Sequence, residues 1–454
     1  MEHLGNKRSE PWARGIFIGV SFLFALITSF WTLTNEIDSQ AWTPGVSWYH
    51  QPSLDIWFES DQPLVYDSMT NTNALWQKTN RHPLFPYVGV IPVKALGLLG
   101  MPERGAVCAL LALGVGLSSA LFALTLSLTV RRRLLQVLIL ALFFCSSSFL
   151  FWSGTCERFA MSSASILAVA AAAAYISDRG RASPALVVVM NVVSLSITLT
   201  NWMFGLLLSI FSFPLKTALR LIAYGFLITA GLWLLQGLFI NQHEQLFKVD
   251  EWNQQFILNP YASGVLQRAA VIFEHTIVMP SVHHYNYSGV PEADVTQFLG
   301  VQHSSPGGTG PLGLGLVITW SGLFIVGAIT WFRRKKKTMF DRFLSLAILG
   351  QLLLHMTYGT ELFLYGLHFT PLLLLLLARG ASDLRGAQQG AMIGTLLIFI
   401  PLLGYHNLIQ LKEVRAKYHV RYEAAVKRIR QTHFERQREE DKNPQTSTEA
   451  ASPK

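Results

Sequence analysis

Long apolar segments that are almost free of charge are the feature that most constrains this chain. The first runs from Ile16 to Leu33, and others of about 17–25 residues recur along the sequence. A helix of that length crosses the roughly 30 Å hydrocarbon core of a bilayer, where every backbone polar group must be paired inside the protein. Because the chain is 51% hydrophobic and only 14% charged, we expect an all-α, polytopic transmembrane helical bundle.

The number and positions of the spans follow from these segments. We expect about eleven spans, with residues 1–410 forming one transmembrane domain and residues 411–454 forming a charged, helical tail that ends in a disordered stretch. The first segment is long for a signal peptide and no cleavage site of small residues follows it, so we expect it to be retained. The predicted spans are 15–34, 105–130, 134–152, 160–177, 184–200, 202–215, 219–240, 311–332, 342–358, 366–379 and 389–408.

Basic residues predict the orientation of the bundle. Cytoplasmic loops of membrane proteins are enriched in Lys and Arg. The N-terminus and five later clusters fall on one side of the predicted spans, which we therefore expect to be cytoplasmic. The clusters are Arg131–Arg133, Arg179 with Arg181, Lys216 with Arg220, Arg333–Lys337, and Arg379 with Arg385. The same bias explains the net charge of +9 without a nucleic acid partner.

Two parts of this topology are weakly marked in the sequence. Residues 184–215 are long for one span and short for two, and we expect a hairpin with Asn201 and Trp202 at the outer interface. The basic segment after residue 408 is expected outside, because clusters close to earlier spans usually dominate the orientation.

Two long outer loops, at 35–104 and 241–310, are expected between these spans. The first loop contains Asp55, Glu59, Asp61, Tyr66, Asp67, Arg81 and His82. Its apolar stretch Tyr87–Leu99 is too short to span, and we expect it to lie in the interface, as an interfacial helix, or to re-enter the membrane. Carboxylates in a long wet loop are about as often simply solvated, so this loop alone does not indicate chemistry.

Two shorter outer turns also carry ionisable residues. Glu157 and Arg158 lie between two closely linked spans, and Glu361 lies in the turn after the ninth span. Ionisable residues held near the membrane are costly and indicate function, although a local ion pair also explains Glu157 with Arg158. His355 and His368, inside apolar segments, are interpreted as packed histidines.

The second outer loop is rich in potential metal ligands. It contains His275, His283, His284 and His303, with Glu274, Glu292 and Asp294 nearby. Their spacing does not match two histidines four residues apart on a helix. A divalent metal ion is therefore allowed, but no metal ligand is assigned, and the three cysteines form neither a disulfide framework nor a metal motif.

The order of these features resembles the GT-C superfamily of membrane glycosyltransferases, of the protein mannosyltransferase or aminoarabinose transferase type. The first helix is followed by an outer loop with an acidic residue and a tyrosine, Asp61 and Tyr66, and then by the segment His82–Pro86. The next outer turn carries Glu157 ahead of an Ala-rich span. A late segment, Tyr365–Pro371, precedes a run of leucines, so the resemblance covers about residues 15–410.

The resemblance implies a polyprenyl-phosphate-linked sugar donor, an acceptor that is a lipid, glycan or protein, and inverting transfer on the outer face. It implies that Asp61 is the catalytic carboxylate and that Glu157 is a second one, which orients the acceptor or a metal. Arg81, Arg158 and Arg268 are candidates for holding the phosphate, since guanidinium groups match phosphate oxygens.

The remaining predicted contacts with substrate are aromatic or polar. Tyr66, His82, Glu361 and Tyr365 are expected to bind substrate together with Arg81 and Arg158, and Trp57 and Trp76 could face the sugar ring. Tryptophan and tyrosine at a membrane interface also occur simply as an aromatic belt.

Three alternatives remain open from the sequence. A transporter or lipid flippase would place charged residues at mid-membrane and show internal repeats, whereas these spans are nearly uncharged in their middle. A non-catalytic assembly protein of the same fold, and a polymerase or ligase of lipid-linked glycans, are equally compatible with the pattern. The small number of cysteines favours a bacterial plasma membrane, with membrane lipids as the surrounding partners.

Overall fold

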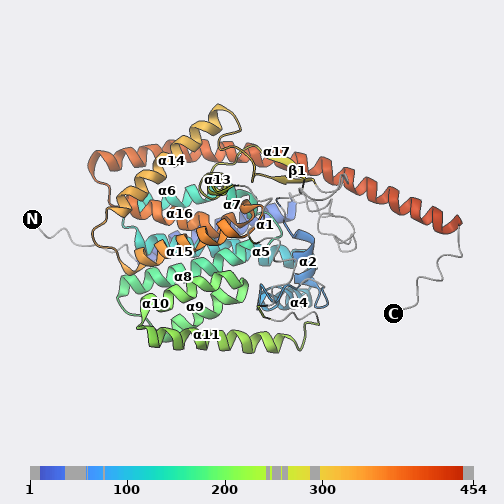
Figure 1. The fold of residues 1–454 in the computed structure, drawn as a ribbon, viewed down its shortest axis with the longest axis horizontal. Coiled ribbons are helices and arrows are strands. Elements are labelled where there is room, and N and C mark those ends of the chain that lie inside the picture. The colour runs from blue at the N-terminus through green and yellow to red at the C-terminus, as the bar shows by residue number, and fades with distance from the viewer. Residues whose placement is uncertain are drawn as a thin grey trace, which may run out of the picture.

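The computed structural model describes residues 11–35, 58, 60–74, 77–241, 246–247, 257, 264–286 and 297–442. For residues 284–286, 297–298 and 418–442 it describes the backbone alone. Over these residues the protein is an all-α, polytopic bundle with one small β-hairpin (Figure 1).

Eight described helices are long and apolar enough to cross a bilayer, and the chain is therefore an integral membrane protein. They are α1 (Pro11–Asn35), α5 (Glu103–Thr129), α8 (Phe159–Arg179), α11 (Leu215–Gln236), α14 (Pro311–Phe332), α15 (Met339–Thr357), α16 (Gly366–Ala381) with the preceding 3₁₀ turn η6 (Leu362–Tyr365), and the first part of α17 (Gly386–Lys442).

The other three predicted spans are helical but short. They are α6 (Arg133–Cys145), α9 (Pro184–Ile197) and α10 (Trp202–Ser212), with 13, 14 and 11 residues. At about 1.5 Å per residue, none covers the roughly 30 Å of hydrocarbon alone. A short helix α7 (Ser147–Trp152) follows α6 after a break at Ser146 and extends its path. All eleven predicted spans are thus helical, while eleven crossings stay a prediction.

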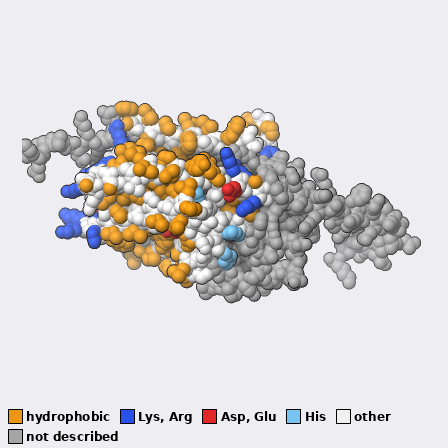
Figure 2. Space-filling view, turned by 90° about the horizontal axis from the view of Figure 1, so that it is seen from above, with side chains coloured by type: hydrophobic (Ala, Val, Ile, Leu, Met, Phe, Trp, Pro, Cys, Tyr) orange, Lys and Arg blue, Asp and Glu red, His pale blue; other side chains and the backbone are white. Residues whose placement is uncertain are grey.

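The outside of the bundle is apolar, as a lipid-facing surface must be. Helix α1 leaves Ile16, Val20, Leu23 and Ile27 exposed and buries only four residues against the rest. Figure 2 shows hydrophobic side chains across the middle of the face formed by α14 and α17, with the largest group of Lys and Arg side chains at one end. Such a belt suits a bilayer, where apolar side chains need no burial in protein.

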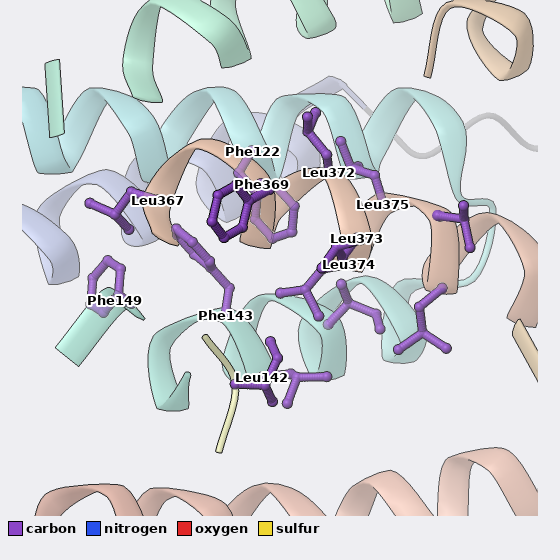
Figure 3. Close-up of a cluster of buried hydrophobic side chains, with 14 of the residues drawn as sticks. Phe122, Leu142, Phe143, Phe149, Leu367, Phe369, Leu372, Leu373, Leu374 and Leu375 are labelled. Carbon is purple, nitrogen blue, oxygen red and sulfur yellow. The ribbon is translucent and has the colours of Figure 1, made fainter. Parts of the chain in front are cut away.

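Helix α16 is the buried centre of the bundle. Its residues Leu372–Leu375 are all buried and lie between α5 and α6, where they meet Phe122 and Phe143 (Figure 3). Gly380 allows the closest approach, because a Cβ there would lie 1.9 Å from the Gly327 carbonyl oxygen of α14. Close backbone contacts of this kind are how helices associate in lipid.

The basic clusters meet at one end of the bundle through a buried carboxylate. Asp341, at the start of α15, accepts hydrogen bonds from Arg379 Nε at 2.9 Å and Nη2 at 3.0 Å, and from Arg334 Nη1 at 3.1 Å. Arg379 also donates to the Thr129 carbonyl at the end of α5. Four helices therefore join here, and three predicted cytoplasmic clusters share this end.

The short hairpin of α9 and α10 turns inside the protein. Its 3₁₀ turn η4 (Leu199–Asn201) buries Asn201 completely, and Asn201 Nδ2 donates to the hydroxyls of Ser162 at 2.8 Å and Ser165 at 2.9 Å. Asn201 is therefore packed against the protein, and its position relative to the membrane interface stays a prediction. Within the turn only Asn201 is buried, and it takes its partners from α8, while Thr200 is exposed.

The first outer loop covers this turn. Leu199 N–H donates to the Arg81 carbonyl and Leu84 N–H donates to the Ser196 carbonyl, both at 2.8 Å. The described part of the loop contains α2 (Gln62–Thr70), α3 (Phe85–Val88) and α4 (Val90–Leu98). The apolar stretch after residue 86 is therefore helical and too short to span, as predicted.

The second outer loop departs from the all-helical expectation. It contains α13 (Val265–Ala270), a π-helical turn η5 (Val271–His275), and the strands β1 (His283–Asn286) and β2 (Gln297–Gly300), which pair antiparallel. The predicted tail is continuous with the last span, since α17 runs through residue 410 without a break and projects beyond the end of the bundle that carries α2 and β1 (Figure 1). Residues 443–454 lie outside the described residues.

Asp341→Asn is expected to destabilise the protein by roughly 3 kcal/mol, because two arginines lose their buried counter-charge. The measurement is the unfolding temperature of the purified protein in detergent. Lys335→Gln, at an exposed position of the same end, is the control and should leave that temperature unchanged. Equal behaviour of the two variants would contradict a stabilising role for Asp341.

Candidate functional site

A cavity of about 450 Å³ opens at the end of the bundle away from the Asp341 cluster. It is lined by residues from the first outer loop, the turn before α8, the η4 turn and the α15–α16 connection. Its charged and hydrogen-bonding lining residues are Asp61, Lys78, Asn80, Arg81, His82, Glu157, Arg158, Ser162, Thr198, Thr200, His355, Tyr358, Tyr365 and His368. Six of the eight predicted site residues therefore converge on one cavity.

Two carboxylates lie next to each other in this cavity. Asp61 precedes helix α2, and its backbone N–H donates to Glu157 Oε1. The Glu157 side chain is 5% exposed and its other oxygen accepts the Arg158 N–H at 3.1 Å. The Glu157 carboxylate is thus held by two backbone N–H groups, one from its own turn and one from Asp61, which is 96 residues away in the sequence.

The two carboxylates differ in their electrostatic environment. Burial disfavours the charge on Asp61, but the Lys78 ammonium, which forms an ion pair with it, outweighs this and holds the pKa of Asp61 below its usual value. Burial, together with the negative charge of Asp61, raises the pKa of Glu157 to about 7. At neutral pH Asp61 is therefore ionised, while Glu157 exchanges a proton readily.

Lys78 is brought to Asp61 by an unusual backbone conformation. Its φ of 52° lies in the left-handed region, which non-glycine residues adopt rarely and mostly at functional sites. The Lys78 carbonyl accepts hydrogen bonds from the N–H groups of Arg81 at 2.9 Å and His82 at 2.8 Å. This tight turn places two cationic side chains and an imidazole on the same side of the cavity.

Arg158 is a buried cation with spare hydrogen-bonding capacity. Its Nη2 donates to Ser68 Oγ at 2.9 Å and its guanidinium lies 4.7 Å from the centre of the Phe85 ring. Among the described residues its Nε has no partner, although Arg158 is only 4% exposed. Buried donors are almost always paired, so this N–H points to a bound group that accepts hydrogen bonds.

His82 is neutral in this environment. Burial and the positive charge of Arg158 lower the pKa of His82 well below its usual value. Its Nδ1 lies 2.7 Å from the Ile197 carbonyl oxygen, which only accepts hydrogen bonds, so Nδ1 carries the proton and Nε2 is an acceptor.

Three residues predicted to contact substrate lie outside the cavity lining and bind other parts of the chain. Glu361 does not line the cavity, because its carboxylate accepts the N–H groups of Val301 at 3.0 Å and Gln302 at 3.1 Å. Arg268 donates to the carbonyls of His355 at 2.7 Å and Gly359 at 2.8 Å. These hydrogen bonds fix the α15–α16 connection.

Tyr66 is the third. Its hydroxyl lies 3.3 Å from Glu103 Oε1, on the side of α2 that faces α5, and Tyr66 is absent from the cavity lining. Burial and the Glu103 carboxylate raise the pKa of Tyr66 to about 12. The helical phase of α2 turns this ring toward α5 while Asp61 lies at the cavity, and a contact of Tyr66 with substrate stays a prediction.

Some predicted residues cannot be placed and others were missed. Asp55, Trp57, Glu59, Trp76, Glu292 and Asp294 lie outside the described residues. His355 and His368 are packed, as predicted, yet both also line the cavity. Lys78 and Asn80 were missed, and their proximity in sequence to Arg81 and His82 is the signal that could have found them.

The described residues contain no group of three or more His, Cys, Asp and Glu side chains that could hold a metal ion. Asp61 and Glu157 are adjacent, but Lys78 and Arg158 supply the positive charges near them. The requirement for a metal ion therefore stays a prediction. Among the described residues, the positive charge near the two carboxylates comes from side chains of the protein.

A comparison of the chain with protein-family models, curated proteins and solved structures finds no match. The cavity is therefore interpreted from its own residues. It combines an ionised carboxylate, a carboxyl group that titrates near neutrality, three cations, the neutral imidazole of His82 and two further histidines. Such a set can bind an anion and move a proton beside it.

The raised pKa of Glu157 predicts a pH-dependent stability. The folded state holds this proton more tightly than the unfolded state, so the stabilisation is present below about pH 4.5 and is lost as the pH rises through about 7. Between pH 5 and pH 8, the unfolding temperature of the wild type should fall more steeply than that of Glu157→Gln. Glu103→Gln, an exposed carboxylate on α5, is the control and should retain the wild-type slope. Parallel slopes for wild type and Glu157→Gln would contradict the raised pKa.

Proposed function

We propose that the protein is a membrane glycosyltransferase that moves a sugar from a polyprenyl-phosphate-linked donor to an acceptor at the outer face of the membrane. The observation that carries the proposal is the convergence of Asp61 and Glu157 with Lys78, Arg81 and Arg158 in one cavity. Transfer of a sugar from a phosphate needs both kinds of group, since a cation stabilises the leaving phosphate and a carboxylate takes the proton of the acceptor.

The reaction divides among these groups in a defined way. The acceptor hydroxyl attacks the anomeric carbon as the bond to the phosphate oxygen breaks, and the configuration inverts. The hydroxyl proton passes to a carboxylate, for which Glu157 has the matched pKa and Asp61 has the lasting negative charge. The polyprenyl phosphate leaves as an anion beside Arg81 and Arg158, whose guanidinium groups match phosphate oxygens.

The position of the cavity favours chemistry at one membrane face over transport. The cavity lies at the end of the bundle opposite the Asp341 cluster, and α16, which passes through the centre, carries an uninterrupted run of buried leucines from Leu372 to Leu377. A transport path would place ionisable groups along the middle of the spans. The proposed orientation puts the Asp341 end in the cytoplasm, where Lys and Arg accumulate, and the cavity outside.

Asp61→Asn should lower the rate of sugar transfer by roughly 10²–10⁴-fold, because it removes the ionised carboxylate from the reacting groups. The measurement is the release of prenyl phosphate from a radiolabelled prenyl-phosphate sugar in proteoliposomes. Asp67→Asn, one carboxylate further along α2 and outside the cavity lining, is the matched control and should stay at the wild-type rate.

The alternatives give different outcomes in the same vesicles. A flippase would move the lipid-linked sugar across the bilayer without releasing prenyl phosphate. A non-catalytic protein of this fold would bind the donor and leave it intact. Unchanged turnover in Asp61→Asn would remove Asp61 from the mechanism.

A further inference from the structure

One wall of the cavity carries no charged side chain. It is formed by the end of α15, the η6 turn and the start of α16, and its lining residues are Leu354, His355, Tyr358, Leu364, Tyr365 and His368. The carboxylates and cations line the cavity from the first outer loop and the turn before α8. The cavity therefore has a charged side and an uncharged side, and a ligand that fits both has an anionic part and a neutral part.

The uncharged wall is built from packed rings. The His355 and Tyr365 rings lie 4.6 Å apart between their centres, and Phe159 lies 5.6 Å from Tyr365 and 5.7 Å from His368. Phe159 follows Arg158 directly, so this cluster adjoins the charged side of the cavity. Flat aromatic surface beside hydrogen-bonding groups is what a sugar ring requires, because its C–H faces are apolar and its edge carries hydroxyls.

Two ring nitrogens on this wall are buried without a partner among the described residues, namely His355 Nδ1 and His368 Nε2. The exposed fractions of the two residues are 2% and 4%. His355 Nε2 lies 3.1 Å from Gln351 Oε1, an oxygen that only accepts hydrogen bonds, so Nε2 carries the proton and Nδ1 presents a lone pair. A hydroxyl donor from a ligand would satisfy this nitrogen, and buried polar atoms are nearly always satisfied.

The uncharged wall is held in place by hydrogen bonds from other segments of the chain. Arg268 binds the carbonyls of His355 and Gly359, and Glu361 binds the backbone of the strand β2 end at Val301. Trp152 Nε1 donates to the Phe363 carbonyl at 2.9 Å. Each contact joins a side chain to a backbone group, and together they fix the backbone of the α15–α16 connection. The imidazoles of His355 and His368 are thereby preorganised for a ligand.

From these observations we propose that His355, Tyr365 and His368 form the subsite for the neutral, polyhydroxylated ring of the ligand, while Arg81 and Arg158 hold its phosphate. The inference rests on the proposed function and adds to it the residues that recognise the sugar. His355 and His368 hydrogen-bond the hydroxyls, and Tyr365 presents its ring to the sugar. The wall then determines which sugar the protein accepts, without taking part in the charge changes of the transfer.

The test compares two sets of lipid probes binding to the full-length protein in nanodiscs. One probe is farnesyl phosphate, and the others are farnesyl phosphates that carry a single mannose, glucose or arabinose. The wild type should bind at least one sugar-bearing probe more tightly than farnesyl phosphate. His368→Phe, which keeps a ring but removes the nitrogens, should lose roughly tenfold in affinity for that probe and none for farnesyl phosphate.

Three further variants separate this role from a structural one. His368→Asn should recover part of the preference because it restores hydrogen-bonding groups, and Arg158→Gln should weaken binding of all probes. His406→Phe is the matched control, since this buried histidine bonds Thr309 at 2.8 Å and lies outside the cavity lining. It should behave as the wild type.

The outcomes distinguish the inference from the function on which it rests. If the wild type binds no probe, the proposed function fails and the sugar subsite fails with it. If the wild type binds the probes but His368→Phe keeps the full preference, or loses affinity for farnesyl phosphate equally, only the sugar subsite is overturned.

Discussion

The turn between α9 and α10, with the hydrogen bonds that hold it, is the feature on which the rest of the site depends. A turn inside a membrane protein exposes backbone groups that lipid cannot satisfy. Here Asn201 and the hydroxyls of Ser162 and Ser165 bind one another, and residues 81–84 close over the turn with backbone hydrogen bonds. The turn held in this way supplies Thr198, Leu199 and Thr200 to the cavity lining.

Charge balance explains how so many ionisable groups coexist there. Isolated charges in a site of this depth would be costly. Lys78 pairs with Asp61, Glu157 accepts backbone donors, and Arg158 is shared between a serine hydroxyl and an aromatic ring. Three nitrogen atoms of cavity-lining residues have no hydrogen-bond partner among the described residues: Arg158 Nε, His355 Nδ1 and His368 Nε2. The same groups that make the site stable thus leave a defined set of positions for a ligand.

The sequence predicted the helices and much of the site because its strongest signals are local. Apolar segments mark helices wherever they occur, and basic clusters around residues 131, 334 and 379 share one end of the bundle, where Asp341 joins the last two. Ionisable residues between closely linked spans also pointed to Glu157 and Arg158, and the order of motifs in the first outer loop pointed to Asp61. What could not be predicted depends on helical phase and on partners distant in sequence. Tyr66 and Glu361 have the expected residue types, but Tyr66 faces α5 and Glu361 binds the backbone near β2.

The unbroken length of α17 has a mechanical consequence. Its 57 residues extend for about 85 Å at 1.5 Å per residue, well beyond the roughly 30 Å of hydrocarbon. Within the bundle Asn407 fixes the helix by donating to the carbonyls of Cys145 and Ile277 and by accepting the Met279 N–H. Ten residues later Lys417 Nζ donates to the Val282 carbonyl at 3.1 Å, so the helix is held through this point. From Lys417 to Lys442 it rises by about 37 Å, so a tilt of about 5° at Lys417 moves its far end by about 3 Å. A small change in the direction of the helix within the bundle is therefore magnified at its projecting end.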